Sequence, residues 1–153
     1  MSNRWVFLAA FLTTVLIVAG AFSLTQFFYF ELAKSVLFLA IAMLVFFNEE
    51  RFAYMLGIMF PVLWFLVDIL VGVFFSDFAT MFRYLSGQGS GALGTPLDGF
   101  ARLSAIFLFF TSLFAWKKEV PDRFVGRTFW ISLVICLAYT GVLTTWYVTH
   151  VAR

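Results

Sequence analysis

The sequence predicts an all-α integral membrane protein: a polytopic bundle of five transmembrane helices with one short interfacial amphipathic helix. Two observations predict this fold. Hydrophobic residues make up 63% of the 153 residues and charged residues 12%, whereas soluble domains are about 45–50% apolar and about 25% charged. Five apolar runs, each bounded by polar or charged residues, have the length of roughly 20 residues that a helix needs to cross a bilayer. With a mean hydropathy of +1.01, a chain of 17.5 kDa needs lipid to cover its apolar surface.

The first two spans are expected at about residues 5–24 and 28–47, separated by three residues. Glu31 and Lys34 lie in the first turns of the second span, where their i, i+3 spacing allows an ion pair. We therefore expect a tight hairpin at the membrane surface, and a four-span bundle with these two segments joined differently is the alternative. The first segment also has features of a signal peptide, because Arg4 precedes an apolar run that ends in small residues. We expect it to be retained as a span.

The third span, at about residues 52–75, contains a single charged residue, Asp68. A carboxylate at the centre of a membrane helix costs at least about 2.5 kcal/mol, so Asp68 is expected to face protein or water. The residues that share its predicted helix face are Gly57, Pro61, Phe65 and Gly72. Small residues let a neighbouring helix approach closely, and a proline can kink a helix, so this face is expected to be a packing seam.

Three interpretations of Asp68 remain open: helix packing within the chain, a contact with another subunit, and proton or cation handling. Asp68 lies nearer the outer end of its helix, so Arg102 at the outer start of the fourth span is the expected counter-ion. Lys34, on the same side, is the second candidate. These three residues form the predicted intramembrane polar site.

The connection after the third span is predicted to hold an interfacial helix at about residues 77–85 and a glycine-rich loop at 86–96. The predicted apolar stripe of this helix, spaced i, i+3, i+4 and i+7, consists of Phe78, Met81, Phe82 and Leu85. The loop sequence GSGALG matches G-x-G-x-x-G, but a nucleotide site of that kind follows a strand and opens a helix. We therefore expect a flexible loop and no nucleotide partner.

The last two spans are expected at about residues 100–116 and 128–148. The fifth span carries small or hydroxyl-bearing residues at every fourth position, which is typical of helices that pack closely in membranes: Ser132, Cys136, Thr140 and Thr144. Basic residues are more numerous on the side of the N-terminus and the 117–127 loop than on the other side. The sequence therefore predicts a multi-pass protein of the cell membrane with the N-terminus and this loop cytoplasmic and the C-terminus outside.

Residue counts exclude several kinds of site within this chain. A single cysteine excludes an intrachain disulfide and a CxxC site, and a single histidine excludes a multi-histidine metal site or a haem held by two histidines. The net charge of +2 is small, so nucleic acid is not an expected partner. We expect no metal and no cofactor bound by the chain alone, while a lipid, quinone or pigment shared with another subunit is open.

These observations favour a non-catalytic membrane subunit that packs into a larger membrane complex and stabilises it through the seams of the third and fifth spans. The alternative is a small homo-oligomeric transporter or channel that uses Asp68 for proton or cation coupling. A lipid-acting enzyme is the third hypothesis, but the polar residues near the interface match no reaction template: Glu31, Asp77, Arg83 and Asp98. We expect the chain not to be an enzyme.

Overall fold

The structure, a computed structural model, describes residues 2–23, 28–88, 95–121 and 123–150. These residues form six helices: α1 (Ser2–Ser23), α2 (Phe28–Phe46), α3 (Glu50–Val71), α4 (Val73–Leu85), α5 (Pro96–Glu119) and α6 (Arg127–His150). All of them except α4 are long and apolar enough to cross a membrane. The described chain is thus all-helical and consistent with an α-helical membrane bundle, and its five long apolar helices are compatible with a multi-pass protein.

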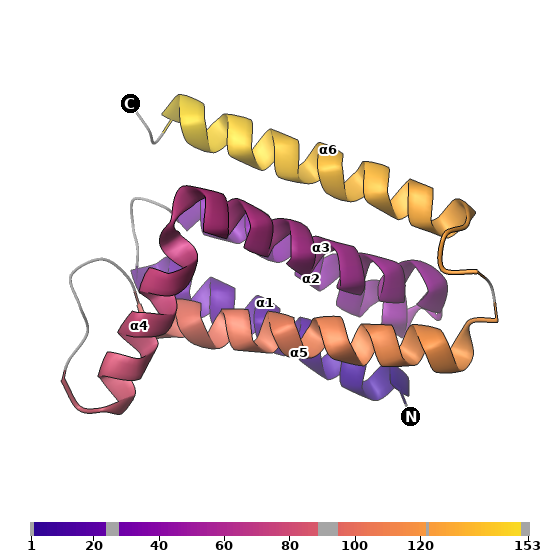
Figure 1. Cartoon of the computed structure of the whole chain (residues 1–153), viewed down its shortest axis with the longest axis horizontal. Helices are drawn as coiled ribbons and strands as arrows, with labels where there is room; N and C mark the ends of the chain where they lie inside the picture. Colours follow the sequence, from indigo (N-terminus) through magenta and orange to yellow (C-terminus); the bar gives the residue numbers. More distant parts are fainter. Residues whose placement is uncertain (1, 24–27, 89–94, 122, 151–153) are drawn as a thin grey trace.

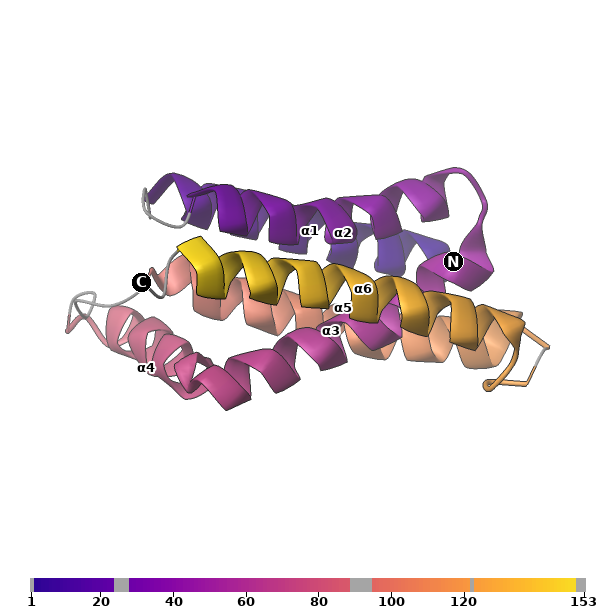
Figure 2. The ribbon, with the colours of Figure 1, turned by 90° about the horizontal axis from the view of Figure 1, so that it is seen from above.

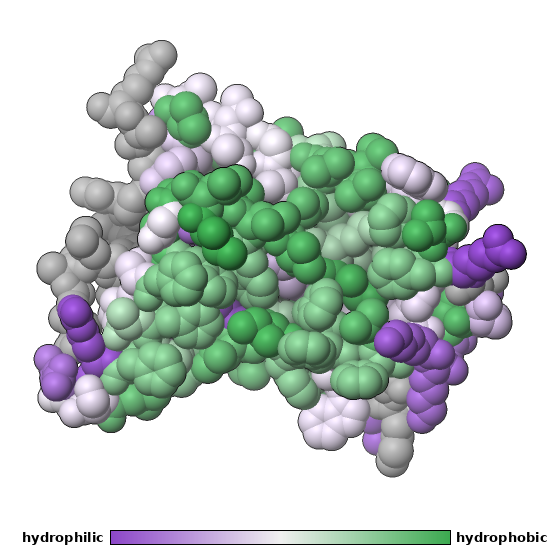
Figure 3. Space-filling model, in the orientation of Figure 1, coloured by the Kyte–Doolittle hydropathy of each residue, from purple (hydrophilic) through white to green (hydrophobic). Residues whose placement is uncertain are grey.

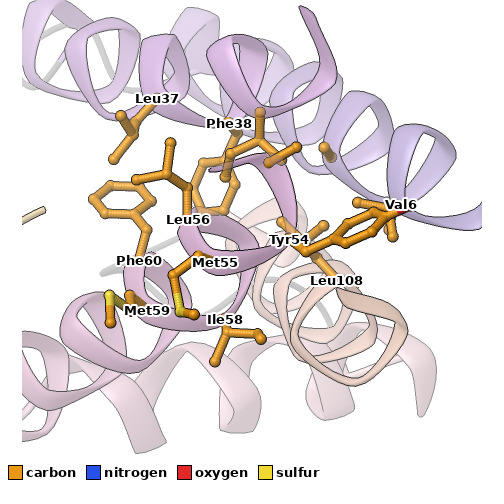
Figure 4. Packing of buried hydrophobic residues seen from close by; sticks show 14 of the residues in the cluster. Val6, Leu37, Phe38, Tyr54, Met55, Leu56, Ile58, Met59, Phe60 and Leu108 are labelled. Atoms are coloured by element: carbon orange, nitrogen blue, oxygen red, sulfur yellow. The ribbon is translucent and has the colours of Figure 1, made fainter. Parts of the chain in front are cut away.

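Four of the long helices form a ring in which α1 packs on α2 and α5, and α3 packs on α2 and α5 (Figures 1 and 2). Side chains with almost no exposed surface form the core around these helices, and several of them are seen in Figure 4: Phe38, Tyr54, Met55, Phe60 and Leu108. The sixth helix, α6, lies outside the ring along α3 and reaches α2 as well (Figure 1). Burial inside the protein is therefore concentrated in the ring.

The third span ends earlier than the sequence predicted. Gly72 has a φ of +82°, in the left-handed region, and its N–H donates to the carbonyl oxygen of Ile69, so α3 stops at Val71. The chain turns there, and α4 crosses the end of the bundle next to α5 (Figure 1). The predicted span 52–75 is therefore too long at its C-terminal end. The short helix begins at Val73 and not at residue 77.

The fourth span is longer than predicted, because α5 begins at Pro96 and ends at Glu119. Asp98 accepts hydrogen bonds from the backbone N–H and the hydroxyl of Thr95, at 3.1 and 2.9 Å, and thereby caps the start of the helix. Pro96, predicted to be in the loop, occupies a first-turn position that suits proline. Residues 89–94, which hold the G-x-G-x-x-G sequence of the predicted loop, lie outside the described residues.

The two ends of the bundle differ in what they carry. The start of α1 and the end of α5 lie at one end of the bundle, and α4 and the end of α6 lie at the other (Figure 1). On the face seen in Figure 3, apolar residues cover the middle and hydrophilic residues gather toward the ends. This distribution suits a protein whose middle is surrounded by lipid.

Candidate functional site: a charged cavity where α4 crosses the bundle

All six helices contribute to the wall of a cavity of about 250 Å³ near the crossing of α4. The charged residues of this wall are Glu31, Lys34, Asp68, Asp77, Asp98 and Arg102. The rest of the wall is mainly aliphatic and aromatic, and includes Phe30, Trp64, Val67, Val71 and Tyr147. The cavity therefore combines a concentrated set of charges with an apolar surface.

Arg102 of α5 is at the centre of the charged set, and only 3% of its surface is exposed. Its Nε and Nη2 atoms donate to Oδ2 of Asp68 in α3, at 3.0 and 2.7 Å. Its Nη1 atom donates to the backbone carbonyl oxygen of Asp98 at 3.3 Å and also forms an ion pair with Asp77 in α4. One guanidinium group thus joins α3, α4 and α5.

Asp77 lies on the buried side of α4, although the sequence placed it among the polar residues near the interface. Burial raises the pKa of the Asp77 carboxyl above its ordinary value of 3.8, and the neighbouring Arg102 partly offsets this effect. The carboxylates of Asp98 and Asp68 raise the pKa further, and Lys34 lowers it. The surroundings of Asp77 therefore shift its carboxyl toward the protonated form.

Lys34 was the second candidate for the counter-ion of Asp68, but the two residues do not pair. Its Nζ atom donates to Oε1 of Glu31 at 2.8 Å within α2, which is the i, i+3 pair that the spacing allowed. The same Nζ atom lies 4.9 Å from the ring centroid of Trp64, and the guanidinium carbon of Arg102 lies 5.6 Å from it. The indole of Trp64 therefore contacts both cations of the cavity. The sequence interpretation assigned Trp64 no role, since an apolar helix gives no signal for which tryptophan meets a cation.

The predicted seam of α3 divides into two parts. Gly57 faces α5, because a Cβ atom there would lie 2.3 Å from Oγ of Ser112, and Pro61 is buried within the helix. Gly72 differs from the expectation, since a Cβ atom there would meet nothing within 4 Å. Its left-handed φ, and not close packing, explains the glycine.

The predicted seam of α6 is likewise split. Ser132 and Cys136 are fully buried and face the ring, and the hydroxyl of Thr140 is also buried. Thr144 is exposed, and its hydroxyl donates to the backbone carbonyl of Thr140 at 2.8 Å. The inward face of α6 therefore covers only the first part of the predicted stripe.

The predicted apolar stripe of the short helix, α4, is also divided between the interior and the surface of the protein. Met81 is buried, and its side chain lies so close to Gly99 of α5 that a Cβ atom on Gly99 would be 2.6 Å from Cβ of Met81. Phe82 and Leu85 are exposed, and Phe78 packs its ring on Phe74 at 5.1 Å. Met81 thus anchors α4 to the bundle, which corrects the prediction that it faces the membrane surface.

No protein-family model matches this chain, and no curated protein or solved structure is significantly similar to it. Within the described ranges, no group of three or more histidine, cysteine, aspartate or glutamate side chains is arranged to hold a metal ion.

Proposed function

We propose that this chain is a non-catalytic subunit of a larger membrane assembly, and that the outward face of α6 is its contact with another membrane helix. The observation that carries this proposal is the place of α6 outside the ring. Only 11% of the most apolar part of α6 is buried, compared with 44% or more in each of the other long helices. A helix so little covered by its own chain presents most of its surface to lipid or to a partner.

The outward face of α6 also has the composition that helix contacts in membranes favour. A shallow groove runs along it, lined by Leu137, Ala138, Gly141, Val142, Thr145, Trp146 and Thr149. Its small residues recur at steps of three or four, and a Cβ atom on Gly141 would meet nothing within 4 Å. Helix interfaces in lipid are enriched in such residues because they let two backbones approach closely.

The groove was not part of the sequence prediction, which placed the α6 seam one face away. Trp146 is one of the lining residues, and the exposed Trp130 adds aromatic surface nearer the start of α6. A lipid, quinone or pigment held at the contact belongs to this proposal, because such molecules have flat or extended apolar bodies that aromatic side chains cover well.

The test is mass spectrometry and an absorption spectrum of the particle that carries this chain, extracted from its own membrane in mild detergent. Fixed partner subunits should purify with the wild-type chain. Ala138→Trp should remove them by filling the groove, while Val36→Trp on the exposed face of α2 is the matched control and should retain them. Wild-type chain that purifies without any partner would overturn the assembly role. Partner loss in both variants, or in neither, would show that α6 is not the contact.

The alternative, a small homo-oligomeric transporter or channel, is favoured by one specific observation. The cavity wall holds four carboxylates but only two basic groups, which suits a site for a proton or cation. In this alternative Asp68→Asn abolishes flux in reconstituted vesicles while the chain remains folded. Because Asp68 binds Arg102, the melting temperature of the variant has to be measured together with the flux.

A further inference from the structure

Some hydrogen-bonding atoms of the charged cavity are not used by contacts among its own residues. Within the described part of the chain, Asp68 and Asp77 each engage Arg102 through Oδ2, so the contacts with Arg102 do not involve Oδ1 of either carboxylate. The indole N–H of Trp64 is buried and lacks an acceptor among the same residues, although Trp64 is only 5% exposed. A buried donor without a partner costs about 1–3 kcal/mol, so the site gains stability from a molecule that supplies the missing contacts.

The net charge of the cavity indicates the sign of the charge that this molecule carries. The lining residues contribute the carboxylates of Glu31, Asp68, Asp77 and Asp98 and the cations of Lys34 and Arg102, a formal charge of −2 when all are ionised. Both cations are already engaged by carboxylates at close range. An added anion would find neither a free cation nor a favourable field, whereas an added cation lowers the net charge of a largely buried site.

The walls indicate the shape of the molecule. Phe30, Trp64 and Tyr147 supply aromatic surface, and Val67, Val71 and Val148 supply aliphatic surface. A bare metal ion makes no use of these walls, whereas an amine with an apolar body uses both the carboxylates and the walls. Ligand sites of this kind are mostly apolar with a few convergent polar groups that fix orientation.

We propose that the cavity binds a small organic amine, with its protonated nitrogen at the Oδ1 atoms of Asp68 and Asp77 and its apolar body against the aromatic and aliphatic wall. An oxygen atom on the amine, such as a hydroxyl, accepts the unused hydrogen bond of the Trp64 indole. This binding is separate from the contact proposed for α6, because the residues of α6 that line the cavity differ from those that line its groove.

The proposal makes binding depend on pH through Asp77. Arg102 and Asp98 from α5, Asp68 from α3 and Lys34 from α2 surround this carboxyl, and burial together with the two neighbouring acids raises its pKa. A proton on Asp77 removes the negative charge that the protonated amine requires. The affinity should therefore rise as the pH increases through the raised pKa of Asp77, as long as the amine stays protonated.

Three probes with the same six-carbon body test the proposal: hexylammonium, hexanol and hexanoate. The full chain is placed in nanodiscs of zwitterionic lipid, and binding is measured by ligand-observed saturation-transfer NMR and by the shift in melting temperature, with empty nanodiscs as the baseline. Hexylammonium should bind at least about tenfold more tightly than the other two, which corresponds to about 1.4 kcal/mol or more. Equal binding of hexanol, tighter binding of hexanoate, or no binding of any probe would each overturn the proposal.

Variants locate the site. Asp77→Asn should weaken hexylammonium binding about tenfold or more, and Glu49→Gln, which removes one exposed carboxylate at the opposite end of α3, should leave it unchanged. Val148→Trp fills the cavity from α6 without altering a charge and should also abolish binding, which keeps the test decisive where Asp77→Asn fails to fold. Unchanged binding in folded Val148→Trp protein would show that the amine binds elsewhere.

Discussion

Gly57 of α3 lies directly against Ser112 of α5: a Cβ atom added to Gly57 would be 2.3 Å from Oγ of Ser112. The hydroxyl of Ser112 is buried and has no hydrogen-bond partner among the described residues. Ser112 therefore fits the space that Gly57 leaves and makes no polar contact there. The close approach of α3 and α5 at this point depends on the small size of both residues.

The variant Gly57→Ala should destabilise the protein by about 1–3 kcal/mol, because the added methyl group forces α3 and α5 apart. Ser112→Gly, introduced together with Gly57→Ala, removes the clashing side chain and should restore most of the loss. The measurement is the thermal unfolding midpoint in detergent for the wild type, both single variants and the double variant. Additive losses in the double variant would contradict the contact.

Removing one partner of the buried pair between Arg102 and Asp68 should be more damaging than removing both. Arg102→Ala leaves the carboxylates of Asp68 and Asp77 without a cation and should cost about 3–5 kcal/mol. Arg102→Lys should also destabilise the fold, because an ammonium cannot donate to three acceptors in the planar arrangement of a guanidinium. Chemical unfolding of Arg102→Gln combined with Asp68→Asn should show partial recovery relative to Arg102→Gln alone.

Two glycines in open surroundings provide a matched pair for backbone conformation. Gly72→Ala should destabilise the turn between α3 and α4 by about 1–2 kcal/mol, because φ is +82° and L-residues disfavour this region. Gly141→Ala, in the middle of α6, should be neutral or stabilising by up to about 1 kcal/mol. Melting temperatures that fall equally for both variants would contradict the role assigned to φ at Gly72.

The stability of the protein should depend on pH through Asp77. Its pKa is raised in the folded state, so the unfolded chain loses this proton at lower pH than the folded chain does. The contribution of Asp77 to stability is present below 3.8, the ordinary value, and is lost as the pH rises through the raised folded value. The difference in melting temperature between the wild type and Asp77→Asn should be measured as the pH rises from below the ordinary pKa to above the raised pKa. It should show the loss of the stability that Asp77 contributes. A difference that does not vary with pH would contradict the assignment.

The membrane orientation is open to cysteine labelling, because the single natural cysteine, Cys136, is fully buried. With the N-terminus and the 117–127 loop cytoplasmic, Gln88→Cys should react with an impermeant maleimide on intact cells. Arg123→Cys should react only after permeabilisation. Both positions are exposed, so a reversed pattern would reverse the proposed orientation.

The sequence predicted the helices well because the length of an apolar run is a strong signal in a membrane protein. It misplaced the end of α3 because residues 73–75 are as apolar as the helix before them, and only the φ of Gly72 marks the break. It missed the start of α5 because Pro96 was grouped with a glycine-rich segment, although Thr95 and Asp98 form a recognisable capping pair.

Within the cavity, the expected pairing of Asp68 with Arg102 appears because both residues lie near the same end of neighbouring antiparallel helices. The position of Asp77 was not predictable, since it depends on the direction that α4 takes after Gly72. The groove of α6 was not predicted from the sequence because apolar residues surround this helix on every side. The pattern therefore does not show which face packs on α3.

The pair formed by Arg102 and Asp68 also has a consequence for how the protein is made. The two residues are 34 positions apart in the sequence, so Asp68 is synthesised before its counter-ion. An unpaired carboxylate or guanidinium is costly in a bilayer, and each helix therefore reaches its most stable position only when the other has been inserted. Their meeting is a late step of biogenesis, and a chain truncated before α5 should be retained by the insertion machinery or degraded.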